Sequence, residues 1–216
     1  MHDDLALWRC VRQETPWPES TEPPPRGAEI RDGVTDFIAT VVRDRDPERA
    51  SRLGTALNRS RTDAARGAPL SFALMEAWQR DVLALPTVPF RDGPAFAKGG
   101  RERYALNTDT RTAFDTCLVE ATQPGIALSA RAVRAYLDVV FFHPFPDGNG
   151  RAAMLALDFV LTRDQVRIDA VGPLFQLPRQ AGDADGALAF VRLLTALLTA
   201  PYRRRPRAPT RHAISD

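Results

Sequence analysis

The sequence contains little lysine, little cysteine and few histidines, and these shortages narrow the classes of protein to consider. Only one of its 29 basic residues is a lysine, Lys98, and 27 acidic residues leave a formal net charge of +2. That balance does not by itself indicate nucleic-acid binding. The two cysteines, Cys10 and Cys117, lie far apart with no C-x-x-C spacing and no histidine nearby. We therefore interpret them as unpaired thiols and expect neither a zinc site nor a redox pair.

Long apolar runs are missing as well. The longest, 152–157, is far too short to cross a bilayer, and the first four residues are acidic where a signal peptide would be basic. We therefore expect a cytoplasmic protein with no membrane partner. A length of 216 residues, 44% of them hydrophobic, predicts one or at most two globular domains with a sizeable core.

Proline and charge divide the chain into three parts. Five prolines crowd into 16–25 among Glu, Ser and Thr, a composition that has little to bury. We predict an N-terminal extension with a proline-rich linker over 1–33, a helical domain over 34–200 and a basic tail over 201–216. The arginine run in that tail is typical of a solvated segment, so nucleic acid is not the expected partner.

Apolar residues recur at helical spacing through most of the central domain. The stripes lie in 37–42, 50–57 and 74–85, and the same spacing returns in 109–122, 129–142, 150–164 and 184–200. Between residues 88 and 104, prolines and glycines interrupt the pattern and leave two short segments that could pair as a hairpin. The predicted class is all-α with one small hairpin.

One segment differs from the rest, FFHPFPDGNGR at 141–151. Pro144 disfavours helical geometry at His143, so the preceding helix should end there and the chain should turn outward. Gly148 and Gly150 allow a tight turn, after which Arg151 begins a new apolar-periodic helix.

The residue types in this segment are those of phosphate chemistry. A glycine-rich turn that opens a helix directs backbone N–H groups at an anion, and Arg151 adds a guanidinium suited to phosphate. Asp147 offers a hard oxygen ligand for Mg²⁺, which is usually held by one or two carboxylates together with the phosphates. His143 can take a proton near neutral pH. Together they predict a phosphate-transfer site.

The nine residues from His143 to Arg151 resemble the signature H-P-F-x-[DE]-G-N-G-R of the Fic/Doc family. The likeness extends over roughly 50–185 and implies a Fic-like helical bundle with a small β-hairpin flap. It also implies transfer of AMP from ATP, or of a related phosphate-containing group, to a hydroxyl acceptor. By this resemblance His143 is the base, Asp147 holds Mg²⁺, and Gly148, Asn149, Gly150 and Arg151 bind the donor's phosphates.

The flap residues implied by the resemblance are Ala95, Phe96, Ala97 and Lys98. In the family the flap aligns the target by strand pairing, a common mode of peptide capture. This segment is poor in the β-branched residues that favour a peptide-pairing strand. The acceptor is therefore left open between a hydroxyl-bearing protein and a small molecule, and a separate antitoxin is left open as a further partner.

Two positions depart from the family pattern. The longer motif ends in a second arginine, and Met154 stands in its place. The inhibitory pattern [ST]-x-x-x-E-[GN] has its nearest counterpart in 62–67, where Arg66 replaces the glutamate. We predict that the usual inhibitory clamp is missing, with Arg66 as an alternative source of the lost cation. For Met154 the simpler interpretation is a core-facing residue of the helix.

Alternative functions remain at this stage. A related enzyme could use another donor, as a kinase or a phosphocholine-type transferase does, or could act on a metabolite. A non-catalytic binding module is a second alternative, although the intact His143 and Asp147 argue against it.

Overall fold

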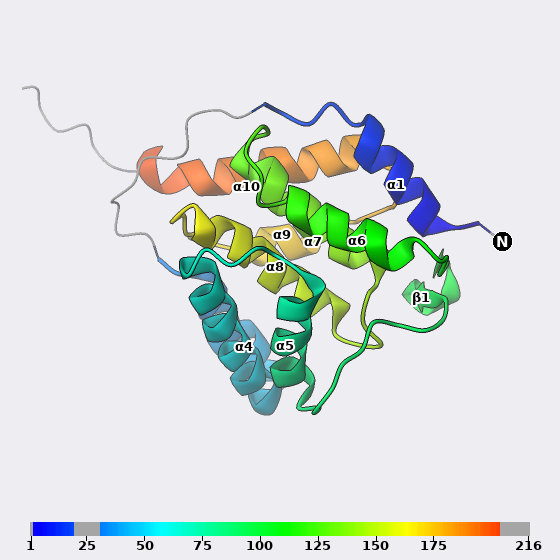
Figure 1. Cartoon of the computed structure of the whole chain (residues 1–216). Helices are drawn as coiled ribbons and strands as arrows, with labels where there is room; N and C mark the ends of the chain where they lie inside the picture. Colours follow the sequence, from blue (N-terminus) through cyan, green and yellow to red (C-terminus); the bar gives the residue numbers. More distant parts are fainter. Residues whose placement is uncertain (1, 20–30, 204–216) are drawn as a thin grey trace, which may run out of the picture.

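The computed structural model describes residues 2–19 and 31–203 and shows a helical protein with one small hairpin (Figure 1). This confirms the predicted fold class. The elements are α1 (Asp4–Glu14), α2 (Gly33–Phe37), a π-helix η1 (Ile38–Val42), α3 (Arg43–Arg45), α4 (Pro47–Ala65), α5 (Phe72–Leu83), β1 (Ala95–Ala97), a 3-10 turn η2 (Lys98–Gly100), β2 (Glu102–Tyr104), α6 (Thr110–Glu120), α7 (Leu128–Phe142), α8 (Asn149–Arg163), α9 (Gly172–Gln176) and α10 (Ala184–Arg203).

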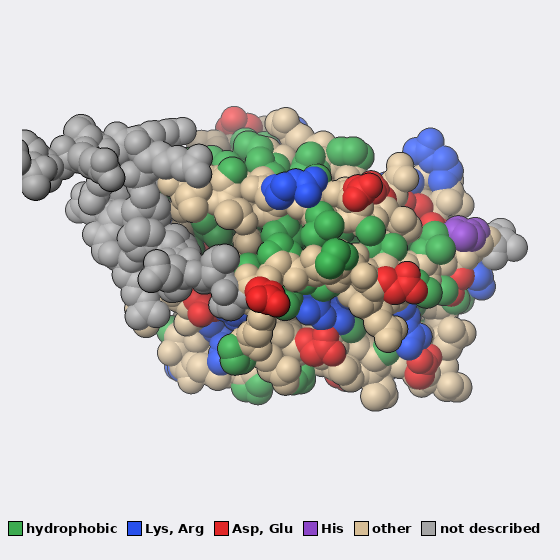
Figure 2. All heavy atoms as spheres, turned by 90° about the horizontal axis from the view of Figure 1, so that it is seen from above, with side chains coloured by type: hydrophobic (Ala, Val, Ile, Leu, Met, Phe, Trp, Pro, Cys, Tyr) green, Lys and Arg blue, Asp and Glu red, His purple; other side chains and the backbone are tan. Residues whose placement is uncertain are grey.

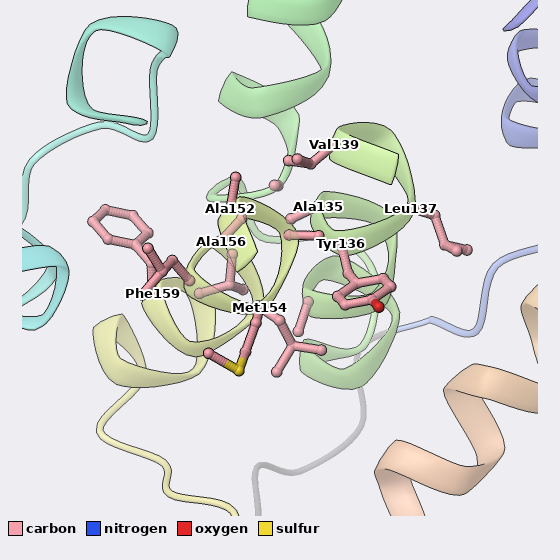
Figure 3. Packing of buried hydrophobic residues seen from close by; sticks show 14 of the residues in the cluster. Ala135, Tyr136, Leu137, Val139, Ala152, Met154, Ala156 and Phe159 are labelled. Atoms are coloured by element: carbon pink, nitrogen blue, oxygen red, sulfur yellow. The ribbon is translucent and has the colours of Figure 1, made fainter. Parts of the chain in front are cut away.

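Helices α7 and α8 form the centre of the core, and the segment 143–148 joins them. Most side chains of both helices are buried, which explains why their sequences are apolar on nearly every face. Small residues such as Ala135, Ala152 and Ala156 allow the two helices to approach closely (Figure 3). The central helix pair therefore forms a rigid support for the loop between its members.

Two layers of helices cover this pair. In Figure 1, α4 and α5 lie on one side, and α1 and α10 lie on the other. Trp8 of α1 is buried against Phe141, with ring centroids 5.1 Å apart, and its Nε1–H donates to Asp138 at 2.9 Å. The N-terminal extension thus contributes a helix to the core. The predicted domain boundaries stay a prediction, and Pro23, Pro24 and Pro25 lie outside the described residues.

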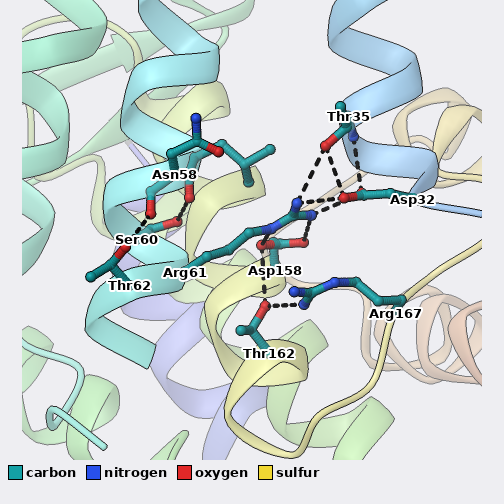
Figure 4. A network of polar contacts seen from close by, with 10 residues as sticks. Asp32, Thr35, Asn58, Ser60, Arg61, Thr62, Asp158, Thr162 and Arg167 are labelled. Atoms are coloured by element: carbon teal, nitrogen blue, oxygen red, sulfur yellow. Dashed lines mark hydrogen bonds and ion pairs between the residues drawn. The ribbon is translucent and has the colours of Figure 1, made fainter. Parts of the chain in front are cut away.

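A partly buried polar cluster joins α4, α8 and the start of α2 (Figure 4). The guanidinium of Arg61 lies between the carboxylates of Asp158 and Asp32 and donates two hydrogen bonds to each. Burial opposes the charge of Asp32, but hydrogen bonds from Arg61 and Thr35 outweigh it and lower its pKa to about 2. These ion pairs set the position along α8 at which α4 packs.

Helix α10 is long and apolar enough, by length and composition alone, to cross a membrane over Ala184–Pro201. This helix is not one uninterrupted apolar run, because Asp185 and Arg192 lie within it. One such helix is weak evidence for a membrane span, since helices of soluble cores pass the same test. Its buried side chains follow helical spacing and face the core: Ala187, Phe190, Val191, Leu194 and Leu198.

Charge is distributed evenly on the face seen in Figure 2. Acidic and basic side chains are interspersed with apolar ones there, and neither sign gathers into a large patch. Most of the predicted basic tail, from residue 204 onward, lies outside the described residues, and residues 201–203 belong to α10.

Candidate active site

His143 lies where the chain leaves α7. The helix ends at Phe142, as Pro144 predicted, and His143 adopts the left-handed conformation, with φ 49° and ψ 53°. Its Nδ1 lies 3.1 Å from the carbonyl oxygen of Val140. Because a carbonyl can only accept, Nδ1 carries the proton in the neutral ring. The lone pair is therefore on Nε2, which is the atom available to act as a base.

The imidazole ring of His143 is held and tuned by its surroundings. It stacks on the buried Tyr104 of β2, with centroids 5.1 Å apart and planes 15° apart. Burial is the largest influence on its pKa and lowers it; nearby Arg91 acts in the same direction, and the Val140 hydrogen bond, Glu102 and Asp147 oppose them. The net pKa is lower than usual, so the ring is neutral at physiological pH.

The turn at Gly148 opens helix α8. Gly148 has φ 75°, a conformation that favours glycine, and a Cβ built there would lie 2.9 Å from Nε2 of Gln79 and displace that amide. The backbone N–H groups of Asn149 and Gly150 donate no hydrogen bond within the described part of the chain, whereas those of Arg151 and Ala152 bond to the Gly148 carbonyl. Two free N–H donors at a helix start can bind an anion. Phosphate binding at this turn stays a prediction.

The side chain of Asn149 does not face this anion site. It is buried, its Oδ1 accepts the Phe145 N–H at 3.0 Å, and its Nδ2 donates to the Phe145 carbonyl at 2.8 Å. Phe145 itself is buried and stacks on Phe72. The side chain of Asn149 therefore closes the loop, and only its backbone is available to a phosphate.

Asp147 and Arg151 lie at the exposed end of the loop. The Asp147 side chain is 78% exposed and pairs with Arg151 at 3.1 Å. The described residues contain no cluster of three or more His, Cys, Asp or Glu side chains that could hold a metal ion. One exposed carboxylate beside a turn with free N–H donors fits Mg²⁺, which takes few protein ligands and completes its shell with phosphate oxygens and water.

The predicted flap is a real hairpin. Strands β1 and β2 pair antiparallel, with Ala95 opposite Tyr104 and Ala97 opposite Glu102. At the outer edge of β2, the N–H groups of Arg103 and Ala105 donate to the carboxylates of Asp4 and Asp3. Among the described residues β1 has no second neighbouring strand, so its edge is open to a further one.

Near Met154 the structure contains a hollow of about 260 Å³ that reaches Gly150 and Arg151 at the start of α8. Met154 is buried, as its simpler interpretation predicted. The hollow is lined by Gly150, Arg151 and Met154 of α8 and by Phe37, Val41, Val42, Arg45, Asp46, Arg49, Leu53 and Phe175. Burial, together with the positive charges of Arg49 and Arg52, lowers the pKa of Arg151 even though Asp147 opposes them. Cations therefore outnumber acids at this end of α8.

The structure places Arg66 far from Met154. This corrects the hypothesis that Arg66 replaces the cation missing there. It is exposed and follows the last residue of α4, two residues before Ala68, whose carbonyl accepts a hydrogen bond from Arg163. Arg163 is the last residue of α8, whereas Gly150 and Arg151 are at its start. The two helices run side by side in the same direction, so Arg66 lies at the wrong end of α8 to replace a cation at Met154.

Comparison with known proteins agrees with this geometry. Residues 69–161 match the sequence model of the Fic/DOC family. The chain carries a Fic/DOC domain. No curated protein matches its sequence.

Solved structures of Fic proteins share the fold. The structure of IbpAFic2 covalently tethered to Cdc42 has 16% sequence identity and a TM-score of 0.59, covering 88% of this chain and 69% of that one. The same values hold for a variant of IbpAFic2 in complex with adenylylated Cdc42. A Fic domain containing signaling protein from Bacteroides thetaiotaomicron has 19% identity and a TM-score of 0.52, covering 79% and 77%.

Several residues of this Fic/DOC domain that shape the site were missed by sequence reasoning. Gln79 of α5 is buried and donates to the Asp147 carbonyl, Tyr104 supports the imidazole, and Arg91 bonds to the loop that carries His143. Arg45 and Arg49 line the hollow. No local pattern marks them, because each acts on an element that is distant in sequence.

Proposed function

We propose that this Fic/DOC domain is a Mg²⁺-dependent transferase that moves AMP, or a related phosphate-containing group, from a nucleotide donor to a hydroxyl of an acceptor protein. The observation that carries the proposal is the convergence of a base and an anion site on one loop. His143 Nε2 is free at its start, and the N–H groups of Asn149 and Gly150 are free at its end.

The reaction follows from these positions. His143 Nε2 takes the proton of the acceptor hydroxyl as its oxygen attacks phosphorus, forming the new O–P bond. For AMP transfer, the bond between the α-phosphorus and the bridging oxygen breaks, and pyrophosphate leaves with the electron pair. Arg151 and the two N–H groups offset the negative charge on the transferring group. Mg²⁺, held by Asp147 and the phosphates, would neutralise further phosphate charge when bound.

The hollow beside Met154 supports a donor with more than one phosphate. Arg45 makes no hydrogen bond or ion pair with the described residues, and Arg49 pairs only with Asp46, at 3.4 Å. Both side chains can therefore turn toward an anion that extends past Arg151. In this proposal Arg45 and Arg49 supply the positive charge that the second arginine of the longer Fic/Doc motif would carry at position 154.

A protein acceptor is supported by the hairpin. The open edge of β1 offers backbone groups to an extended peptide, and Phe96 is 52% exposed there. IbpAFic2, which shares the fold, has been solved with its target Cdc42. The location in the cytoplasm and the absence of an inhibitory glutamate remain predictions.

The test is a search by mass spectrometry for the group that is added. The purified chain and His143→Ala are incubated with Mg²⁺, a cell extract as acceptor, and ATP, UTP, CTP or a phosphocholine donor in turn. We expect a nucleotidyl mass on a hydroxyl side chain with the wild type and none with His143→Ala. Addition of phosphate or phosphocholine would change the donor class, and no addition with any donor would refute the transferase proposal.

A further inference from the structure

Arg91 is a buried arginine whose hydrogen bonds all lead to backbone. It is 8% exposed. Within the described part of the chain its guanidinium donates to three carbonyl oxygens: Phe142 at 3.2 Å, Ala105 at 2.6 Å, and Gly93. Its own backbone N–H donates to the Pro144 carbonyl at 2.9 Å. Burial opposes the charge of Arg91, and among the described residues the carboxylate of Asp3 favours that charge without a direct ion pair. A buried charge whose hydrogen bonds all go to carbonyls is costly, so its retention calls for an explanation.

The four partners belong to two structures that must meet for transfer. Phe142 and Pro144 are the residues on either side of His143, and Arg91 holds the carbonyl of each. Gly93 and Ala105 flank the hairpin: Gly93 lies two residues before β1, and Ala105 directly follows β2. The side chain of Arg91 thus connects both ends of the hairpin to Phe142, and its backbone N–H adds the contact with Pro144 on the other side of the base.

We propose that Arg91 is a positioning residue that holds the His143 loop and the β1–β2 hairpin in one fixed arrangement. The effect of this arrangement on catalysis rests on the proposed function, whereas the arrangement itself rests on the hydrogen bonds of Arg91. Arginine suits the role because its planar fork donates to several oxygens at once, whereas a lysine ammonium cannot span them. The carbonyl of Phe142 is also one of the unpaired groups at the end of α7, where a cation is favoured.

The arrangement has an electrostatic consequence for His143. The charged groups that act on its ring are Arg91, from the segment before the hairpin, Glu102 of β2, and Asp147 of the loop. Arg91 disfavours the protonated ring, and the two acids favour it. Removing the charge of Arg91 should therefore raise the pKa of His143. Replacing the guanidinium fork by another cation should loosen the contacts of the hairpin and the loop but change the pKa of His143 little.

Two variants separate charge from geometry. Arg91→Lys keeps the charge and loses the fork, and Arg91→Met loses both. The control is Arg101→Met, which removes an exposed charge from the same hairpin and loses only a bond to the Lys98 carbonyl. The readouts, on the full chain without donor or acceptor, are NMR titration of the His143 imidazole and hydrogen exchange of the hairpin amides.

We expect hairpin exchange roughly tenfold faster in both Arg91 variants, because hydrogen bonds at both ends of the hairpin are lost. The pKa of His143 should rise in Arg91→Met, and neither quantity should move in the control. In a transfer assay, Arg91→Lys should lower kcat by about 10- to 100-fold with little change in KM for the donor, as a misplaced base does.

Unchanged exchange and unchanged titration in folded Arg91 variants would overturn the proposal, whether or not the enzyme is active. If Arg91→Met does not fold, Arg91→Lys decides by hydrogen exchange alone. Failure of the wild type to transfer any group would refute the proposed function, and the two structural readouts would still test the role of Arg91.

Discussion

At the scale of single residues, the protonation of His143 sets how the activity depends on pH. The base must be neutral, and burial lowers its pKa below the ordinary value of about 6.5. We expect kcat to rise with pH through a midpoint below about 6.5 and to be level at neutral pH. Initial rates between about pH 5 and 8, with circular dichroism at each pH, measure this. A midpoint above 7 would mean that another group titrates.

Asp147 is the residue with which to test the metal. Its carboxylate is exposed, so Asp147→Asn should leave the fold intact while removing the charged ligand. We expect the Mg²⁺ concentration for half-maximal transfer to rise, with partial recovery at high metal. The measurement is a Mg²⁺ titration of the transfer rate, with unfolding by urea as the control for stability. Full activity of the wild type in excess EDTA would remove the metal from the reaction.

Two glycines provide a matched test of backbone strain. Gly148→Ala places a methyl group in the left-handed region and 2.9 Å from Gln79, so we expect a loss of about 1–3 kcal/mol of stability together with activity. Gly54→Ala adds the same methyl group within α4, where nothing lies within 4 Å, and should stabilise by up to about 1 kcal/mol. Urea melts of both variants test the pair, and equal effects would contradict the argument.

At the scale of elements, the pairing of α4 with α8 depends on one ion-pair cluster. Asp158 is almost fully buried and pairs with Arg61 at 2.8 Å. Asp158→Asn leaves a buried guanidinium with one acid fewer, and we expect a loss of about 3 kcal/mol of stability. The change should appear in the urea midpoint. A loss below 1 kcal/mol would show that Asp32 alone satisfies Arg61.

The same cluster predicts an acid dependence. The pKa of Asp32 is about 2 in the folded chain and lies in the ordinary range near 4 when unfolded. Its stabilisation is therefore complete above about pH 4 and is lost as the pH falls toward 2. Asp32→Asn should flatten the pH dependence of stability in that window, measured by thermal melts, and lower the stability near neutral pH.

The start of α4 is the element that tests the hollow. Arg49→Ala removes a cation that lines it, and we expect KM for a triphosphate donor to rise about tenfold with kcat nearly unchanged, as the loss of one charged hydrogen bond would give. Arg43→Ala is the control, because Arg43 belongs to the adjacent helix α3 and does not line this hollow. Equal KM values for the two variants would place the donor elsewhere.

At the scale of the whole molecule, the helices followed from sequence because their signals are local. Periodicity predicted helices over 129–142 and 150–164, and α7 and α8 occupy these segments to within one residue. Leu85 shows where such signals end. It continues an apolar stripe, but Ala84 takes the left-handed conformation, α5 stops at Leu83, and Leu85 is 50% exposed.

The conformation of the loop was also predictable, because the end of α7 and the turn at Gly148 depend on residues close together in the chain. The error over Arg66 and the omission of Arg91 have one cause: their positions are set by how distant elements pack. Nothing near Arg66 in the sequence shows at which end of α8 it lies. Nothing near Arg91 shows that its partners are the neighbours of His143.

The contact of Trp8 with Asp138 also bears on how the chain folds during synthesis. The two residues are 130 positions apart, so α1 leaves the ribosome long before the helix against which it packs. Contacts of such long separation form late and slow folding. We therefore expect α1 to remain undocked until α7 has emerged, and the hairpin, whose outer edge α1 holds, to become ordered only near the end of translation.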